Sequence, residues 1–162
     1  MRTLLAFALL LIGLYATAQA QTTLPEFKLT GHSLVLPAPL AFKPGTAELT
    51  PGSTAGLEHI KKYLEQKTYI SLLRLEGHVA EKAATDQALS EQRAQAVAAW
   101  LVAHGVECRR LLPVGFGSTK PAGTTPEANT RIEAVNTALR DRPIGGLPVD
   151  GGGRVVDAAC KP

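Results

Sequence analysis

The sequence predicts an α/β (α+β) domain of two layers, in which helices pack on one face of a mixed sheet. Two segments carry apolar residues at helical spacing, and the predicted order of elements is strand, helix, strand, helix, strand, strand. Roughly 140 residues follow an N-terminal leader, a length that suits one domain with a single core. We therefore expect one domain over residues 39–139, an extended lead-in over 21–38 and a C-terminal arm over 140–162.

The leader over residues 1–20 has the pattern of a secretory signal peptide. Arg2 precedes an apolar run from Leu4 to Leu14, and Ala18-Gln19-Ala20 follows as the cleavage site. Cleavage would leave Gln21 as the first mature residue, with an uncleaved anchor helix as the alternative. No later segment is long enough to cross a bilayer as a helix, so we expect a secreted protein without a membrane span after cleavage.

The first elements follow from local patterns. Residues 40–49 are expected to form a strand that runs into a turn. A helix should then begin at Thr50, whose hydroxyl can accept a hydrogen bond from exposed amides, while Pro51 stands where no amide donor is needed. The helix covers the sheet, because its apolar residues share one face: Leu57, Ile60 and Leu64.

The middle of the domain is a strand followed by a second helix. Residues 70–76 are rich in Ile and Leu and end at Gly77, which indicates a strand. The helix runs from about Asp86 to His104 and ends at Gly105, a residue suited to helix termination. Arg93 falls inside the apolar arc of this helix, so its charge must reach an anion, a carbonyl or solvent at the helix end.

The last elements are two strands and a tail. We expect strands over residues 111–116 and 131–139, the latter with Arg131 and Glu133 as outward neighbours of Ile132 and Ala134. Residues 147–149 and 154–156 flank a glycine run, which indicates a small hairpin or a loose arm.

Charge and cysteine content exclude some classes of protein. The formal net charge of +3 falls by one with the loss of Arg2, too little to indicate nucleic-acid binding. Cys108 and Cys160 would enter an oxidising compartment, so we expect a disulfide that pins the tail. The cysteines and histidines show no metal-ligand spacing, and we expect no metal and no cofactor.

Three phrases carry a family resemblance. Residues 77–80 read Gly-His-Val-Ala, residues 89–94 read Leu-Ser-Glu-Gln-Arg-Ala, and residues 115–117 read Gly-Phe-Gly before Pro121. In this order they resemble the OmpA-like peptidoglycan-binding domain of bacterial envelopes, whose motif is roughly Gly-His-Thr-Asp, a short loop, then Leu-Ser-x-x-Arg-Ala. The resemblance covers about residues 40–135 and implies an OmpA C-terminal-domain-like fold.

The resemblance also implies a pocket for the diaminopimelate part of the peptidoglycan stem peptide. By motif position Arg93 is the guanidinium that would hold a carboxylate, with a structural arginine as the alternative. The acid that would face the ligand's ammonium is replaced by Ala80. Glu81 or Asp86 is a possible substitute, although a solvated or helix-capping role fits each of them better.

Further positions would shape the pocket. Gly77 and His78 lie at its wall, where His78 is expected to be a neutral ring that donates to a loop carbonyl. Asn129 and Arg131 are rim candidates from a phrase that departs from the family at Thr130, and Arg131 is equally an outward strand residue. Ser90 is expected to hydrogen-bond backbone.

We expect no enzyme, because no nucleophile has an adjacent base and no Gly-x-Ser-x-Gly or His-Glu-x-x-His phrase occurs. The resemblance implies a noncatalytic periplasmic module, associated with the cell wall or outer membrane, that binds peptidoglycan and helps organise the envelope. The alternative is a scaffold that kept the fold but binds an envelope protein partner, which Ala80 and Thr130 favour.

Overall fold

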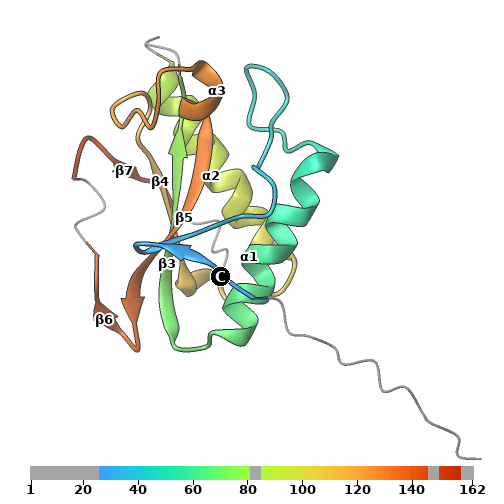
Figure 1. The fold of residues 1–162 in the computed structure, drawn as a ribbon, viewed down its shortest axis with the longest axis vertical. Coiled ribbons are helices and arrows are strands. Elements are labelled where there is room, and N and C mark those ends of the chain that lie inside the picture. The colour runs from blue at the N-terminus through green and yellow to red at the C-terminus, as the bar shows by residue number, and fades with distance from the viewer. Residues whose placement is uncertain (1–25, 81–84, 146–149, 158–162) are drawn as a thin grey trace, which may run out of the picture.

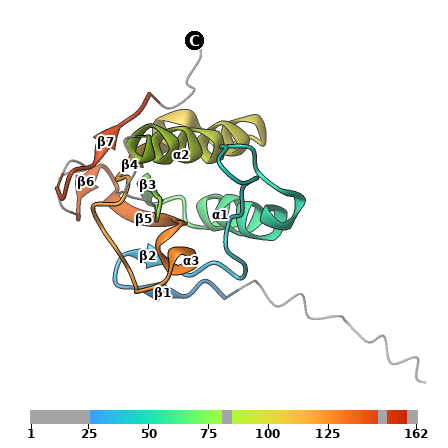
Figure 2. The same cartoon turned by 90° about the horizontal axis from the view of Figure 1, so that it is seen from above.

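The computed structural model describes residues 26–80, 85–145 and 150–157, and in them a mixed sheet carries two long helices on one face (Figures 1 and 2). The predicted signal peptide, Glu81, Cys160 and the segment 147–149 lie outside the described residues. The predicted cleavage and the predicted Cys108–Cys160 disulfide therefore stay predictions. Among the described residues, no helix has the length and apolar character needed to cross a membrane.

The sheet has seven strands, and six of them lie on one path that ends with β7. The strand order is β1-β2-β5-β3-β4-β7, and β6 pairs with β5 off this path. The strands β3 and β4 are parallel and all other pairs are antiparallel. The strand bounds are β1 Leu29–Thr30, β2 Ser33–Leu34, β3 Ile70–His78, β4 Leu111–Gly115, β5 Arg131–Leu139, β6 Arg142–Pro143 and β7 Arg154–Val155.

Two long helices and three short ones connect the strands. The long helices are α1, Thr54–Gln66, which precedes β3, and α2, Asp86–Ala103, which connects β3 to the parallel β4. The short helices are η1 Pro51–Ser53, η2 Cys108–Arg110 and α3 Pro126–Asn129. Because parallel neighbours need a crossover, α2 must return across the sheet, and it places its N-terminus beside the end of β3.

The core lies between the helices and one face of the sheet. Leu73 and Leu75 of β3 point into it, while Arg74, Glu76 and His78 alternate onto the opposite face. Its fully buried residues include Ile60 and Leu64 of α1, Val97 and Leu101 of α2, and Ala134 of β5. The predicted fold class, a mixed sheet with helices on one face, is confirmed.

The bounds of a helix or strand lie close to the predicted ones where the hydrophobic pattern and a glycine indicate the same end. The strand β5 has the predicted bounds, and β3 runs two residues beyond the predicted end. The helix α2 starts at the predicted residue, and Gly105 follows it with φ +93°, a conformation that favours glycine.

Residues 40–49 correct the sequence-based prediction of a sheet strand. They form a closed loop in which a single bridge joins Phe42 and Leu49. Ser53 explains the change, because its hydroxyl accepts from the Ala41 amide at 2.8 Å and donates to the Ala41 carbonyl at 2.7 Å. Thr50 does not cap the helix with its side chain, and its hydroxyl donates to Ala41 as well.

The sheet also includes strands that the sequence left as lead-in and tail. The hairpin of β1 and β2 pairs with β5, where Ser33 lies opposite Val135 and Leu34 opposite Ala134. In the tail, β7 pairs with β4 through Val155 opposite Val114. The sheet therefore extends to both sides of the predicted domain.

Candidate functional site

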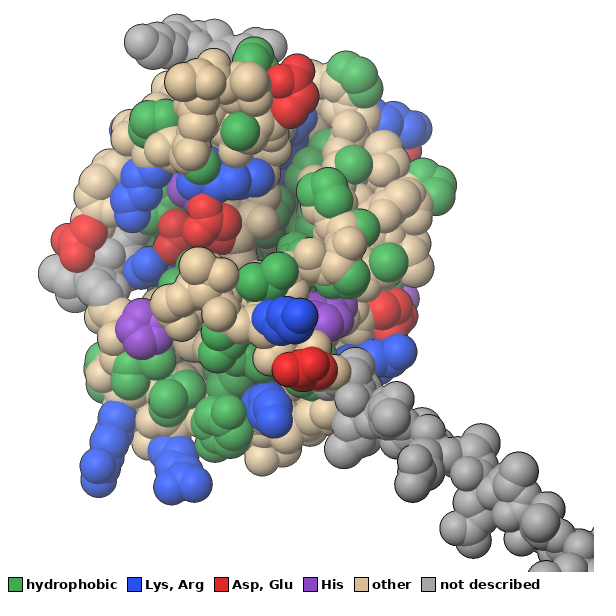
Figure 3. Space-filling view, in the orientation of Figure 1, with side chains coloured by type: hydrophobic (Ala, Val, Ile, Leu, Met, Phe, Trp, Pro, Cys, Tyr) green, Lys and Arg blue, Asp and Glu red, His purple; other side chains and the backbone are tan. Residues whose placement is uncertain are grey.

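The site predicted from the sequence lies where β3 and β4 end and α2 begins, beneath α3 and the loop 40–49 (Figure 1). Figure 3 shows a hollow in the surface between α3 and this loop.

Arg93 lies two turns into α2 and is only 6% exposed. Its Nε donates to the Thr46 carbonyl at 2.9 Å, and its guanidinium carbon lies 4.9 Å from the centre of the Phe42 ring. The loop 40–49 therefore holds this cation through one hydrogen bond and one cation–π contact. The sequence predicted a carbonyl among the possible partners, but neither Phe42 nor Thr46 was singled out for this role.

Ser90 joins α2 closely to the ends of β3 and β4. Its hydroxyl accepts from the Gly117 amide and donates to the Gln87 carbonyl, each at 2.8 Å, as expected for a residue that hydrogen-bonds backbone. A Cβ on Gly77 would lie 2.2 Å from the Ser90 carbonyl oxygen, and one on Gly115 would lie 2.6 Å from the Glu91 amide nitrogen. Glycine at both strand ends thus lets the helix approach closely enough to position Arg93.

Ala80 and Thr130, the two departures from the family phrases, contact each other. The Ala80 amide donates to the Thr130 hydroxyl at 3.2 Å. This part of the wall therefore carries a methyl group and a hydroxyl instead of charged side chains. The sequence indicated each departure separately, but only the fold shows that they are neighbours, fifty residues apart in the chain.

Two of the predicted site residues have structural roles. Asn129 closes its own loop, because its side chain accepts from the amides of Ala122 and Gly123 and donates to the Gly123 carbonyl. Asp86 is the first residue of α2 and is buried, and its carboxylate lies at the positive end of the helix dipole. The preceding Thr85 is the N-cap, and its side chain makes no capping hydrogen bond among the described residues.

The other two, His78 and Arg131, belong to a charged cluster on the sheet face away from α1 and α2. Glu76 and Glu133 lie opposite each other in the β3–β5 register, as do His78 and Arg131. Arg74 donates to Glu76 Oε1 from Nε at 2.6 Å and also through Nη2 at 2.5 Å. Arg131 Nε donates to Glu133 Oε1 at 2.6 Å. Charged side chains and a histidine gather below α3 in Figure 3.

His78 differs from its expected role in this cluster. Its ring stacks on Phe116 at 5.3 Å, and neither ring nitrogen has a hydrogen-bond partner among the described residues. The expected hydrogen bond to a loop carbonyl is therefore not formed with them. Nε2 lies 3.5 Å from Glu76 Oε2, a long contact.

The pKa of Glu76 shows the balance of charge in the cluster. Burial raises this pKa, but His78 and the Arg74 guanidinium lower it by more, with a further contribution from Lys120, so the net shift is downward. Potential metal-ligating atoms of Glu76, His78 and Glu133 lie within 4.8 Å of one another. Both carboxylates are already neutralised by arginines, however, so we interpret the cluster as an ion-pair network and not as a metal site.

A scan against protein-family models matches residues 41–134 to the OmpA family. The chain belongs to the OmpA family. This match spans the strands, helices and loops that build the hollow and confirms the resemblance. A search of curated proteins found no match.

Solved structures share the OmpA-family fold. An outer membrane protein from Borrelia burgdorferi has a TM-score of 0.55 and 24% identity, covering 68% of this chain and 95% of that one. The peptidoglycan-associated lipoprotein from Burkholderia pseudomallei has a TM-score of 0.52 and 22% identity, covering 61% and 88%. The periplasmic domain of Helicobacter pylori MotB has a TM-score of 0.57 and 18% identity, covering 67% and 78%. At these identities the likeness shows the fold.

The predicted site thus contains a buried arginine and a close helix–sheet contact, and Ala80 and Thr130 lie side by side in its wall. Sequence reasoning missed the pairing of Arg74 with Glu76 and took Glu133 as an outward strand residue. The signal that could have found the cluster is the run of charged residues at alternate positions on both strands, Arg74 and Glu76 on one and Arg131 and Glu133 on the other.

Proposed function

We propose that the protein is a noncatalytic periplasmic module that associates with the cell wall by binding the peptidoglycan stem peptide. Arg93 supports this role most directly, because α2 carries its guanidinium to the loop 40–49, which borders the hollow in Figure 3. A buried guanidinium suits a carboxylate, since it offers several donors in one plane. Membership of the OmpA family and likeness to a peptidoglycan-associated lipoprotein support the same assignment.

The bound group in this proposal is the diaminopimelate residue of the stem peptide. Its carboxylate would meet Arg93, while Ala80 offers no partner for its ammonium. The loss of one charge-assisted hydrogen bond costs ~1.5–3 kcal/mol. We therefore expect an affinity roughly tenfold to a few hundredfold below that of a site with an acid in place of Ala80.

A second function has its own support. The Ala80–Thr130 contact puts two uncharged side chains side by side in the described part of the wall, and Asn129 and Arg131 are held by their own neighbours. These features favour a scaffold that kept the fold and binds an envelope protein through the same hollow. The proposed Cys108–Cys160 disulfide would then fix the tail beside the domain, which a mass comparison of reduced and unreduced protein can test.

Co-sedimentation of the mature chain with purified peptidoglycan separates the two functions. We expect saturable binding that soluble diaminopimelate competes for, a loss of about tenfold or more in Arg93→Ala, and a gain of similar size in Ala80→Asp. Arg142→Ala is the matched control, because Arg142 is an exposed arginine on β6 at the other end of β5.

Thermal unfolding of each variant must first show a folded domain, since Arg93 is buried. Binding that Arg93→Ala leaves unchanged would refute the proposed role of this arginine. Binding that appears only in Ala80→Asp would favour the scaffold.

A further inference from the structure

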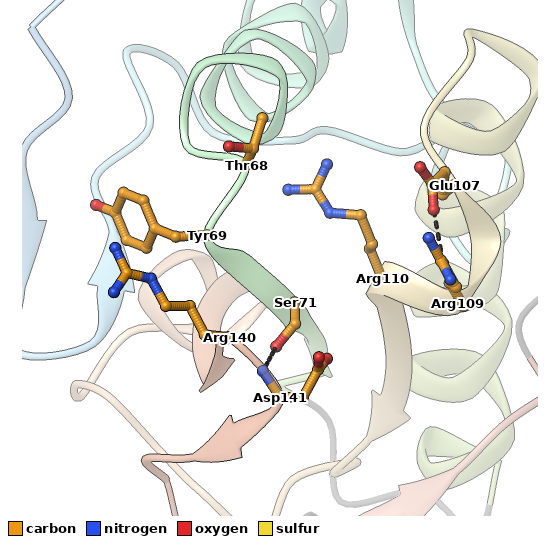
Figure 4. A pocket seen from close by; sticks show the side chains of 8 residues that line it. All are labelled: Thr68, Tyr69, Ser71, Glu107, Arg109, Arg110, Arg140 and Asp141. Atoms are coloured by element: carbon orange, nitrogen blue, oxygen red, sulfur yellow. Dashed lines mark hydrogen bonds and ion pairs between the residues drawn. The ribbon is translucent and has the colours of Figure 1, made fainter.

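A second polar cavity lies at the opposite end of the sheet, where β3 and β4 begin and β5 ends. Its volume is about 370 Å³, within the range of small-molecule sites. It is open to one side and is lined by Thr68, Tyr69, Ser71, Glu107, Arg109, Arg110, Arg140 and Asp141 (Figure 4). The cavity is separated from the hollow near Arg93 by the length of β3, whose nine residues span about 30 Å.

The three arginines of the cavity differ in the partners of their guanidinium groups. Arg109 is paired with Glu107 at 2.6 Å on the exposed side. Arg110 donates to the carbonyls of Leu64, Lys67 and Ile70, which fixes its guanidinium without neutralising its charge. In Figure 4, Arg110 extends toward the turn that carries Thr68 and Tyr69. The cavity therefore contains a rigidly held cation.

Arg140 supplies a second cation from the turn between β5 and β6. Its side chain extends toward the Tyr69 ring in Figure 4, and among the described residues no acid pairs with it. Arg140 and Asp141 both have positive φ, 48° and 62°, which is uncommon for residues other than glycine. Two hydrogen bonds hold this turn against the start of β3: Arg140 N donates to the carbonyl of Tyr69, the residue before β3, at 2.7 Å, and Asp141 N donates to Ser71 Oγ at 2.8 Å.

The charges of the cavity give it a preference for anions. After the Arg109–Glu107 pair is set aside, the lining has two further cations, Arg110 and Arg140, and one further acid, Asp141. Asp141 points to the other side of the turn from Arg140 in Figure 4. Hydroxyl groups of Thr68, Ser71 and Tyr69 add hydrogen-bond donors. A guanidinium group with neighbouring hydroxyls suits the oxygens of a carboxylate or phosphate.

We propose that this cavity binds a small oxyanion ligand, carrying a carboxylate or a phosphate, at Arg140 and beside the Tyr69 ring. The site is independent of peptidoglycan binding, because none of its residues lies near Arg93. Tyr69 is 45% exposed, so an apolar part of the ligand can pack on its ring.

Titration of the mature chain with inorganic phosphate and, separately, with glucuronate tests the proposal by NMR chemical shifts at low ionic strength. We expect saturable shifts at the cavity with at least one probe, and the stronger probe identifies phosphate or carboxylate as the preferred group. Arg140→Gln should weaken this binding about ten- to hundredfold, the effect of losing charge-assisted hydrogen bonds. Arg110 is not a suitable test, because it holds carbonyls at the end of α1.

Two further variants separate ligand binding from a structural role. Asp141→Asn should strengthen anion binding several-fold by removing the one uncompensated acid, and asparagine tolerates positive φ. Arg142→Gln, an exposed arginine outside the cavity, should leave binding unchanged. The proposal is overturned if neither probe saturates, or if Arg140→Gln and Arg142→Gln bind alike. Arg140→Gln should also leave peptidoglycan co-sedimentation unchanged, which keeps the two proposals distinguishable.

Discussion

Replacing Arg74 by methionine should destabilise the domain strongly, because it would leave the Glu76 carboxylate without its main partner. Arg74 is 8% exposed and Glu76 is 5% exposed, so little water can replace the guanidinium. Arg74 donates through both Nε and Nη2 to Glu76 Oε1. Breaking a buried pair of this kind from one side costs ~3–5 kcal/mol, a large part of the stability of a small domain.

The double variant Arg74→Met/Glu76→Leu is the matched comparison. It removes both charges together, and apolar side chains of similar size often replace a buried ion pair at little cost. We therefore expect the double variant to recover most of the lost unfolding free energy. The recovery should be incomplete, because His78 and Glu133, the neighbours of Glu76, would still have lost a charged group beside them. Urea unfolding of wild type, both single variants and the double variant gives the coupling free energy.

The pH dependence of Arg74→Met provides an independent check. Its deficit should shrink at acid pH, because protonation of Glu76 removes the unpaired charge. If Arg74→Met lowered the unfolding free energy by less than about 1 kcal/mol, as for an exposed pair, the predicted cost of breaking this buried ion pair would be wrong. It would also be wrong if the double variant were as unstable as Arg74→Met.

Three further predictions concern the same strands and α2. Gly77→Ala should lower the unfolding free energy by about 1–3 kcal/mol or more, since the added Cβ would lie 2.2 Å from a backbone oxygen. Gly52→Ala is the control: its nearest contact would be at 3.7 Å, so it should change the unfolding free energy by less than about 1 kcal/mol. Ser90→Ala should cost ~1–3 kcal/mol in urea unfolding, because the buried Gly117 amide loses its acceptor, and an unchanged midpoint would exclude this role. The pKa of Glu76 is lower in the folded state than its ordinary value of 4.5, so Glu76 contributes stability above pH 4.5 that is lost as pH falls through the folded-state pKa. Glu76→Gln should therefore flatten the acid side of the curve of unfolding free energy against pH. An unaltered slope there would argue against this contribution of Glu76.

The elements that could be predicted are those whose signal is local. Hydrophobic periodicity and a terminating glycine define α2, with Gly105 at its end, and apolar residues define β5. The hairpin of β1 and β2 has no such signal, because each strand is two residues long and is fixed by pairing with β5 a hundred residues away. The strand expected at residues 40–49 failed for a related reason, since Ser53 takes both backbone groups of Ala41.

The candidate site was predictable in its motif residues and not in their contacts. The position of Arg93 within an apolar helix face predicted that its charge must reach an anion, a carbonyl or solvent, and the structure shows a buried side chain that donates to a carbonyl. Its partners, the Thr46 carbonyl and the Phe42 ring, come from a loop that the sequence assigned to a strand. The cavity around Arg140 had no sequence signal at all, because it forms only where a turn after β5 meets the start of β3.

The short strand β7 has a consequence for how copies of the domain behave when crowded. A long unpaired strand is a template that can recruit another chain and start fibrous self-assembly. Here β7 pairs with the outer side of β4 at Val114 and Gly115. The Val156 amide donates to the Pro113 carbonyl at 3.0 Å, and Pro113 has no backbone N–H that could pair with another strand. Truncation before Asp150 would uncover this template and convert a monodisperse preparation into one that aggregates.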